Sequence, residues 1–220
     1  MRENLTELVF ILDRSGSMSG LEADTIGGFN SLVEKQKKEE GEAIVSTVLF
    51  DDNCEVIHDR VDIKKVEKLT DKEYYVRGCT ALLDAVGGAI HHIGNVHKYA
   101  REEDRPAKTL FIITTDGMEN ASRRYSLKDV KKLINRQQEK YKWEFIFLGA
   151  NIDAIEVAES IGIKASHAAN YHCDSRGTKV NFCALDAAVS RVRRSKAKEA
   201  GCVLEDADWK REIVEDFESR

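Results

Sequence analysis

The stretch Leu8-Val9-Phe10-Ile11-Leu12-Asp13-Arg14-Ser15-Gly16-Ser17 decides how this 220-residue chain is interpreted. Five consecutive apolar residues, ended by an acid and two serines, are typical of a buried parallel strand that opens into a loop. The loop offers one carboxylate and two hydroxyls at alternate positions, and its glycine lets the backbone turn between the serines. All three side chains are oxygen donors, which suit a hard cation such as Mg²⁺ or Mn²⁺. Taken alone, the pattern is better explained by an ordinary turn and helix cap, because serines are common in turns and Asp often caps helices.

Two further stretches carry similar residues at similar places. The apolar run Leu110–Thr115 predicts a second buried strand, and it is ended by Asp116. Thr80 stands directly before a run with apolar residues at helical spacing. The candidate metal ligands, in chain order, are therefore Asp13, Ser15, Ser17, Thr80 and Asp116.

This set resembles the metal-ion-dependent adhesion site of von Willebrand factor A domains, including the Thr-Asp-Gly after the fourth core strand. The resemblance covers residues 5–170 and suggests the stand-alone intracellular prokaryotic type. It implies that Ser15, Ser17 and Thr80 hold the ion directly, while Asp13 and Asp116 act largely through bound waters. Neutral hydroxyl ligands would leave the ion electrophilic, so that an acidic side chain of a protein partner could complete its coordination.

Other residues are candidates for the rim of such a site: Gly16, Cys79, Gly117, Glu119 and Asn120. Glu119 and Asn120 follow the second acid, where simple turn chemistry is an equally good explanation. Cys79 could be a reactive thiol beside the ion, but we expect a small buried filler. The histidines His91, His92 and His97 lack the spacing of a helical zinc site and are expected at the surface or core edge.

The fold class predicted from the chain is a doubly wound α/β domain with a mostly parallel, six-stranded sheet and helices on both faces. The strand 44–50 and the alternating strand 54–61 are separated by only three residues, so they should pair antiparallel at the sheet edge. Helices are expected over residues 21–38, 81–103 and 178–198. The pair Gly27-Gly28 inside the first of them should permit its close packing on the sheet. We expect one domain over 1–200, including a C-terminal packing helix, and an acidic amphipathic tail over 201–220. The tail should form one short helix that docks on this domain or on a partner.

The composition restricts the partners and the compartment. The chain has a net charge of −5, with 42% hydrophobic and 33% charged residues, which argues mildly against a dedicated nucleic-acid binder. No apolar run is long enough to span a membrane. The five cysteines are odd in number and form no C-x-x-C pair, which fits reduced thiols. The sequence therefore leads us to expect a cytoplasmic monomer.

Three functions remain to be weighed. The resemblance favours a non-enzymatic, Mg²⁺- or Mn²⁺-dependent protein-binding module. A metal-dependent phosphohydrolase would use Asp13 as nucleophile, as in haloacid dehalogenase-like phosphatases, but those enzymes place a second acid where this chain has Ser15. A nucleic-acid-binding protein would use the basic segment Arg191–Lys198, which is otherwise explained as a solvated helix end that complements the helix dipole.

Overall fold

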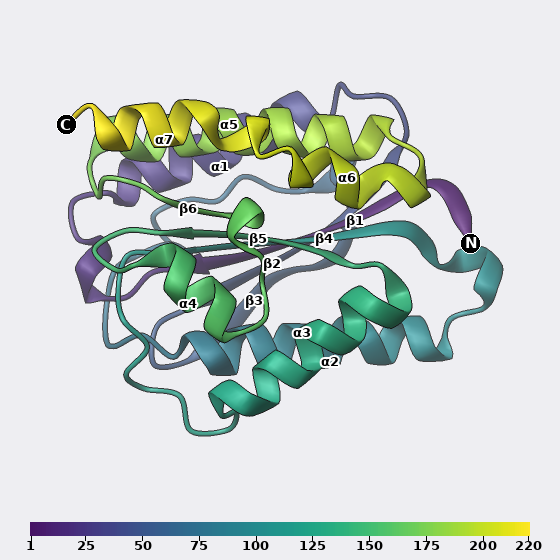
Figure 1. Ribbon diagram of the computed structural model, residues 1–220, viewed down its shortest axis with the longest axis horizontal. Helices are drawn as coiled ribbons and strands as arrows, with labels where there is room; N and C mark the ends of the chain where they lie inside the picture. Colours follow the sequence, from purple (N-terminus) through teal and green to yellow (C-terminus); the bar gives the residue numbers. More distant parts are fainter.

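The computed structural model describes residues 1–220 and is built around a six-stranded sheet in the order β3-β2-β1-β4-β5-β6 (Figure 1). The strands are β1 (Arg2–Asp13), β2 (Glu42–Phe50), β3 (Cys54–Asp62), β4 (Pro106–Thr115), β5 (Glu144–Gly149) and β6 (Ala168–Asn170). All neighbouring pairs are parallel except β2 and β3. The predicted fold class, including the antiparallel hairpin at one edge, is confirmed.

Helices cover both faces of the sheet (Figure 1). On one face lie α1 (Glu22–Gln36), α5 (Ser175–Arg194), α6 (Ala200–Glu205) and α7 (Arg211–Glu218), and on the other lie α2 (Leu82–Tyr99), α3 (Leu127–Tyr141) and α4 (Ala154–Ser160). Short 3₁₀ turns occur at Gly16–Met18, Ile63–Lys65, Glu102–Asp104, Ala165–His167, Ala197–Glu199 and Asp208–Lys210. None of the helices is long and apolar enough to cross a membrane.

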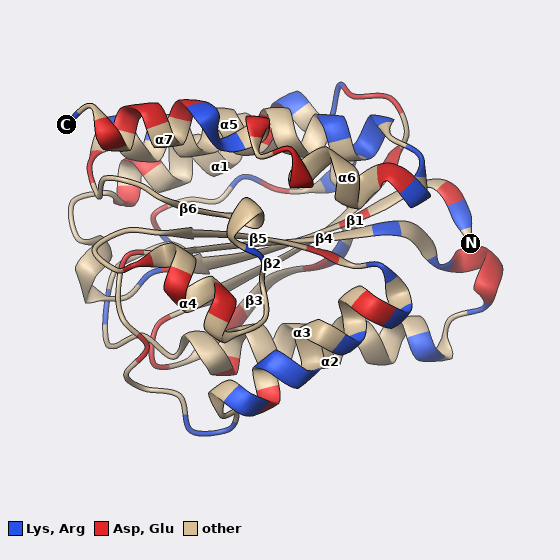
Figure 2. Cartoon of the chain, viewed as in Figure 1, with Lys and Arg blue, Asp and Glu red and all other residues tan.

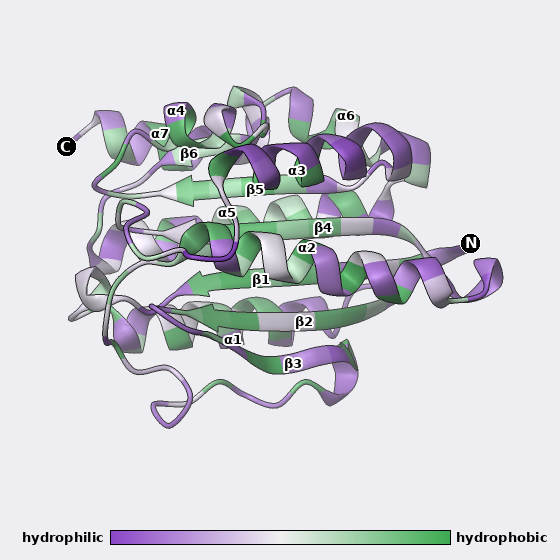
Figure 3. Ribbon diagram, turned by 90° about the horizontal axis from the view of Figure 1, so that it is seen from below, coloured by the Kyte–Doolittle hydropathy of each residue, from purple (hydrophilic) through white to green (hydrophobic).

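The strand β1 contributes side chains to the hydrophobic core on both faces of the sheet, because its successive side chains point to opposite faces. Leu8, Phe10 and Leu12 pack in the cluster under α1 and α5, whereas Val9 and Ile11 pack in the cluster under α2 and α3. The strands are accordingly mostly hydrophobic (Figure 3). Burial on both faces explains why this strand is a continuous apolar run without alternation.

Two helical expectations need correction. The helix expected over 81–103 ends at Tyr99, because Ala100 is extended and its carbonyl accepts a hydrogen bond from Arg105 Nε at 3.0 Å. The pair Gly27-Gly28 was expected to permit close packing of helix on sheet. A Cβ at residue 28 would instead lie 2.1 Å from Cδ2 of Phe182 on α5, so the glycine permits close packing of two helices.

The C-terminal residues continue the layer that covers the sheet. Leu204, Trp209 and Ile213 are buried in the same cluster as α1 and α5, although acidic residues recur along α7 (Figure 2). The tail forms two helices where the sequence indicated one, and both pack on their own chain.

The basic end of α5 is engaged within the chain. Arg193 is buried and donates to the carbonyl oxygens of Gln36 and Gly41, at 2.5 and 3.0 Å. Arg194 pairs with Glu39 at 2.8 Å. These guanidinium groups lock α5 to the end of α1, which leaves less positive charge free for nucleic acid than the sequence suggested.

Candidate functional site

The carboxyl ends of β1 and β4 lie side by side and bring the two predicted acids together. The strands are parallel neighbours, with Leu12 paired with Thr114, so that Asp13 and Asp116 both emerge at the same edge of the sheet. From β1 the strand order runs to β2 and β3 on one side and to β4, β5 and β6 on the other. The order therefore reverses between β1 and β4. Such a point is where doubly wound folds bind ligands.

Four of the five candidate ligands form one chain of hydrogen-bonding side chains. Thr80 Oγ1 lies 3.1 Å from Ser15 Oγ, which lies 3.1 Å from Ser17 Oγ. Ser17 Oγ in turn donates to Asp116 Oδ1 at 2.5 Å. Three segments far apart in sequence therefore place three hydroxyls and a carboxylate in one cluster.

The fifth candidate, Asp13, lies outside this chain of hydroxyls and holds the backbone of Ser15. One carboxylate oxygen accepts the backbone N–H of Ser15 at 2.7 Å, and the other accepts the Thr115 hydroxyl at 2.6 Å. The Tyr74 hydroxyl donates to the Asp13 carbonyl at 2.5 Å. Asp13 is only 1% exposed, so its carboxylate is held and shielded at once.

Burial raises the pKa of Asp13 above its ordinary value, and this is the largest effect on that group. Hydrogen bonds from Ser15 and Thr115 favour the ionised form and oppose the shift. Repulsion from Asp116 raises the pKa further but is the smallest of these causes. The repulsion between the two acids therefore affects Asp13 less than its burial and its hydrogen bonds do.

Asp116 also contacts a residue that the sequence did not single out. Cys173, in the loop between β6 and α5, donates from Sγ to Asp116 Oδ2 at 3.2 Å. Burial, together with this contact to a carboxylate, raises the pKa of the thiol to about 12. Cys173 is therefore a neutral donor to the acid at neutral pH, and its thiolate is strongly disfavoured.

Two of the rim candidates, Asn120 and Glu119, have different roles. Asn120 holds Thr80, accepting its backbone N–H at 2.9 Å and donating its own N–H to the Thr80 carbonyl at 3.1 Å. Glu119 turns away, because its carboxylate accepts the backbone N–H groups of Leu83 and Ser122, each at 2.8 Å. It thus performs turn and helix-start chemistry.

Gly16 and Cys79 lie on loops that touch each other. Gly16 donates its backbone N–H to the carbonyl of Gly78 at 3.1 Å. Cys79 is exposed, so the expectation of a buried filler is wrong. Gly78 has a φ of +66°, which turns the chain so that the Cys79 side chain faces outward while its N–H reaches Asp52 at 3.2 Å.

The second glycine of the rim, Gly117, lies close to the hydroxyls. A Cβ there would come within 3.1 Å of both Ser17 Oγ and Thr80 Oγ1. Glycine therefore leaves open the space beside the hydroxyl cluster. Converging neutral oxygens, one adjacent carboxylate and an open space together fit a hard divalent cation.

The histidines do not take part in this cluster. His92 pairs with Asp59 at 2.8 Å, and His97 contacts the buried Glu7 at 2.5 Å. A cleft of about 1020 Å³ begins beside the site at Gly78 and Asn120 and runs between β3 and α2.

Sequence reasoning assigned no supporting role to three groups that contact the cluster: Tyr74, Thr115 and Cys173. For Thr115 one signal was available: its hydroxyl comes directly before Asp116, at the end of β4. A side chain at that position can reach the end of the neighbouring strand β1, where Asp13 lies. Nothing in the spacing of the other two indicates their contacts.

No protein-family model and no curated protein matches the chain, whereas solved structures do. The manganese-loaded TRAP protein of Plasmodium vivax is 18% identical, with a TM-score of 0.57, over 82% of this chain and 74% of that one. Proximal thread matrix protein 1 of the mussel byssus, with a zinc-occupied MIDAS motif, is 15% identical over 86% of this chain, with a TM-score of 0.59.

A von Willebrand factor type A protein from Catenulispora acidiphila is 17% identical, with a TM-score of 0.56, over 86% of this chain. The chain spans 46% of the mussel protein and 43% of the Catenulispora protein. At these identities the likeness concerns the fold. The chain has the fold of a von Willebrand factor A domain.

Proposed function

We propose that this protein is a non-enzymatic module that binds a partner protein through a divalent cation, Mg²⁺ or Mn²⁺. The observation that carries the proposal is the convergence of Ser15, Ser17 and Thr80 on one another beside Asp116. These residues, with Asp13, would hold the ion. The bound ion would supply an electrophilic centre with a coordination position for a carboxylate of the partner.

The fold neighbours support the metal part of this proposal at a general level. One of them is described as manganese-loaded and another as carrying zinc in its MIDAS motif. The partner's acidic residue, the choice of Mg²⁺ and a cytoplasmic, monomeric state belong to the proposal. They rest on the donor chemistry and on the composition of the chain.

The geometry disfavours the phosphohydrolase alternative. A nucleophilic Asp13 would need a free carboxylate oxygen directed at substrate, but both of its oxygens accept hydrogen bonds and its side chain is buried. Its arrangement is that of a group that positions its neighbours. The nucleic-acid alternative is weakened by the internal contacts of Arg193 and Arg194.

A single hydroxyl can test the proposal. Thr80→Val keeps the shape of the side chain and removes the oxygen, so Mn²⁺ binding measured by electron paramagnetic resonance should be lost or greatly weakened. Thr178→Val is a matched control, because Thr178 is buried and its hydroxyl has no hydrogen-bond partner. Affinity capture with Mg²⁺ and with chelator should then return partners that depend on both the ion and Thr80. Unchanged Mn²⁺ binding in Thr80→Val would refute the assigned site.

A further inference from the structure

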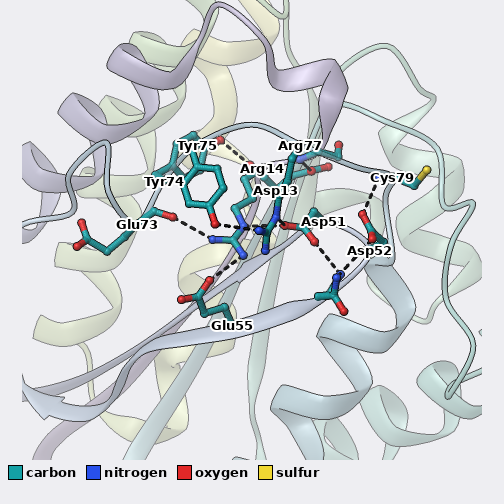
Figure 4. Close-up of polar contacts among 12 residues, drawn as sticks. Asp13, Arg14, Asp51, Asp52, Glu55, Glu73, Tyr74, Tyr75, Arg77 and Cys79 are labelled. Atoms are coloured by element: carbon teal, nitrogen blue, oxygen red, sulfur yellow. Dashed lines mark hydrogen bonds and ion pairs between the residues drawn. The ribbon is translucent and has the colours of Figure 1, made fainter.

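The residue between Asp13 and Ser15 carries a charge into the interior. Arg14 is fully buried, and its guanidinium lies near Glu73 and Glu55 (Figure 4). Its Nε donates to Asp51 Oδ2 at 2.9 Å, and its Nη1 donates to the Glu73 carbonyl at 2.9 Å. A buried guanidinium is costly unless it is paired in this way. The candidate metal loop is therefore tied to the turn between β2 and β3.

Asp51 is the centre of that connection. The same Oδ2 accepts a second guanidinium, through Arg77 Nε at 2.8 Å, and Oδ1 accepts the N–H of Asn53 at 2.8 Å. Its backbone carbonyl accepts the N–H of Ala81 at 2.8 Å. Figure 4 shows the carboxylate between the two arginines. One fully buried carboxylate thus joins the loop of Arg14 to the loop that precedes α2.

Asp51 contacts the chain on both sides of Thr80, through Arg77 before it and Ala81 after it. Arg77 precedes Thr80 by three residues and donates its backbone N–H to the Arg14 carbonyl at 3.0 Å. Between them, Gly78 accepts the N–H of Gly16 at 3.1 Å. The distance of 3.1 Å between Thr80 Oγ1 and Ser15 Oγ is a consequence of how these two loops are joined.

Other side chains contact the two guanidinium groups that Asp51 binds. Arg14 Nη2 also lies 2.8 Å from Glu55, but that side chain is 51% exposed and is screened by water. The Tyr75 ring contacts both guanidinium groups, with its centroid 5.3 Å from Arg14 Cζ and 5.0 Å from Arg77 Cζ. Burial raises the pKa of Asp51, but hydrogen bonds from Arg77, Asn53 and Arg14 outweigh it and lower the pKa overall. The carboxylate is therefore ionised at neutral pH.

We propose that Asp51 is a positioning residue for the candidate cation site. By holding Arg14 and Arg77 together it keeps the Ser15 and Thr80 hydroxyls in contact before any ion arrives. Its single negative charge also offsets part of the positive charge of two guanidinium groups that would otherwise oppose a cation nearby. This inference rests on the proposed function, because it assigns Asp51 a role in the same site.

The decisive variant is Asp51→Asn, which keeps the shape and removes the charge. Mn²⁺ affinity, measured by electron paramagnetic resonance, should fall by about tenfold or more, which corresponds to about 1.4 kcal/mol. Hydrogen exchange in the metal-free protein should accelerate at the amides of Gly16 and Ala81, which carry the contacts between the loops.

Glu7→Gln is the matched control. Glu7 is also a fully buried carboxylate paired with an arginine, Arg60 at 2.6 Å. It stands on β1, the strand that ends at Asp13. It precedes Asp13 by six residues, about 20 Å at roughly 3.3 Å per residue. This variant should lose stability while keeping the Mn²⁺ affinity of the original protein and its slow exchange at Gly16 and Ala81.

Arg77→Gln provides a second measurement if Asp51→Asn does not fold. The Arg77 side chain is 44% exposed, so its loss is tolerable. The substitution removes the connection between Asp51 and the Thr80 loop, together with the hydrogen bond from Arg77 to the Tyr75 hydroxyl. It should weaken Mn²⁺ binding by about threefold or more, a fraction of the 1.4 kcal/mol of a tenfold change. Unchanged Mn²⁺ affinity in both Asp51→Asn and Arg77→Gln, or an equal loss in Glu7→Gln, would overturn the inference and leave the metal site standing. Absence of Mn²⁺ binding in the original protein would overturn the proposed function itself.

Discussion

Replacement of Gly117 by alanine should separate ion binding from folding. The added methyl carbon would lie 3.1 Å from both Ser17 Oγ and Thr80 Oγ1, which is closer than an ordinary van der Waals contact. It would thus occupy the space over the hydroxyl cluster, where the cation is proposed to bind. Gly117 does not have a positive φ, so alanine imposes no backbone strain there.

The expected magnitudes differ between the two properties. In the metal-free protein, alanine gains about 0.4–1 kcal/mol from the unfolded state, and a small shift of the two hydroxyls offsets it. An ion at one hundred times its dissociation constant adds about 2.7 kcal/mol to the free energy of unfolding. At roughly 2–4 °C per kcal/mol, the original protein should gain about 5–10 °C in melting temperature. Gly117→Ala should gain less than about 2 °C under the same conditions, a response worth at most about 1 kcal/mol.

Thermal unfolding followed by circular dichroism, with saturating Mg²⁺ or Mn²⁺ and with EDTA, measures both quantities. Gly88→Ala on α2 is the control, because a Cβ there would meet nothing within 4 Å. It should be at least as stable as the original protein and should keep the full response to the ion. An equal response in Gly117→Ala would mean that the cation binds elsewhere, and the assignment of this cluster would fail.

Three other variants test the site and its surroundings. Asp116→Asn retains an oxygen acceptor but loses the charge, so the metal-induced shift in melting temperature should disappear while metal-free stability changes little. Burial raises the pKa of Glu144 to about 7 from 4.5, so this group makes the protein less stable as pH rises through that interval. Glu144→Gln should therefore gain stability over the original protein by up to about 3 kcal/mol at pH 8 and little at pH 4, measured by urea unfolding; a gain independent of pH would contradict this. Gly28→Ala should cost about 1–3 kcal/mol through its overlap with Phe182, whereas Gly27→Ala, where a Cβ meets nothing within 4 Å, should cost nothing; equal stabilities would refute the packing argument.

The fold was predictable because its signals are local. The continuous apolar runs of β1 and β4 indicate strands buried on both faces, and the three-residue turn after Phe50 requires an antiparallel partner. The end of α2 was not predictable in the same way. The apolar spacing continues to Val96, and the helix stops where Arg105, beyond the turn, binds the carbonyl of Ala100.

The candidate ligands were also predictable, because each terminates or follows an element with a clear pattern. What composition and spacing lack is adjacency: that Asp13 lies beside Asp116 follows from the strand order, which the resemblance to a known fold implied and the structure shows. The supporting contacts lie further from prediction still. Cys173 reaches Asp116 from a loop 57 residues later, through a fold that only the complete packing defines.

Arg14 illustrates why a ligand motif does not disclose its own support. In the sequence, it stands between two candidate ligands and would be expected to face solvent or the partner, as most arginines do. In the structure it is buried, because Asp51 lies 37 residues later on a turn that only the pairing of β2 with β1 brings within 2.9 Å. A buried charge is costly to leave unpaired, so the motif and the turn depend on each other energetically. The ligand positions of such a site can therefore be identified one by one from sequence, whereas its rigidity depends on a contact between two loops.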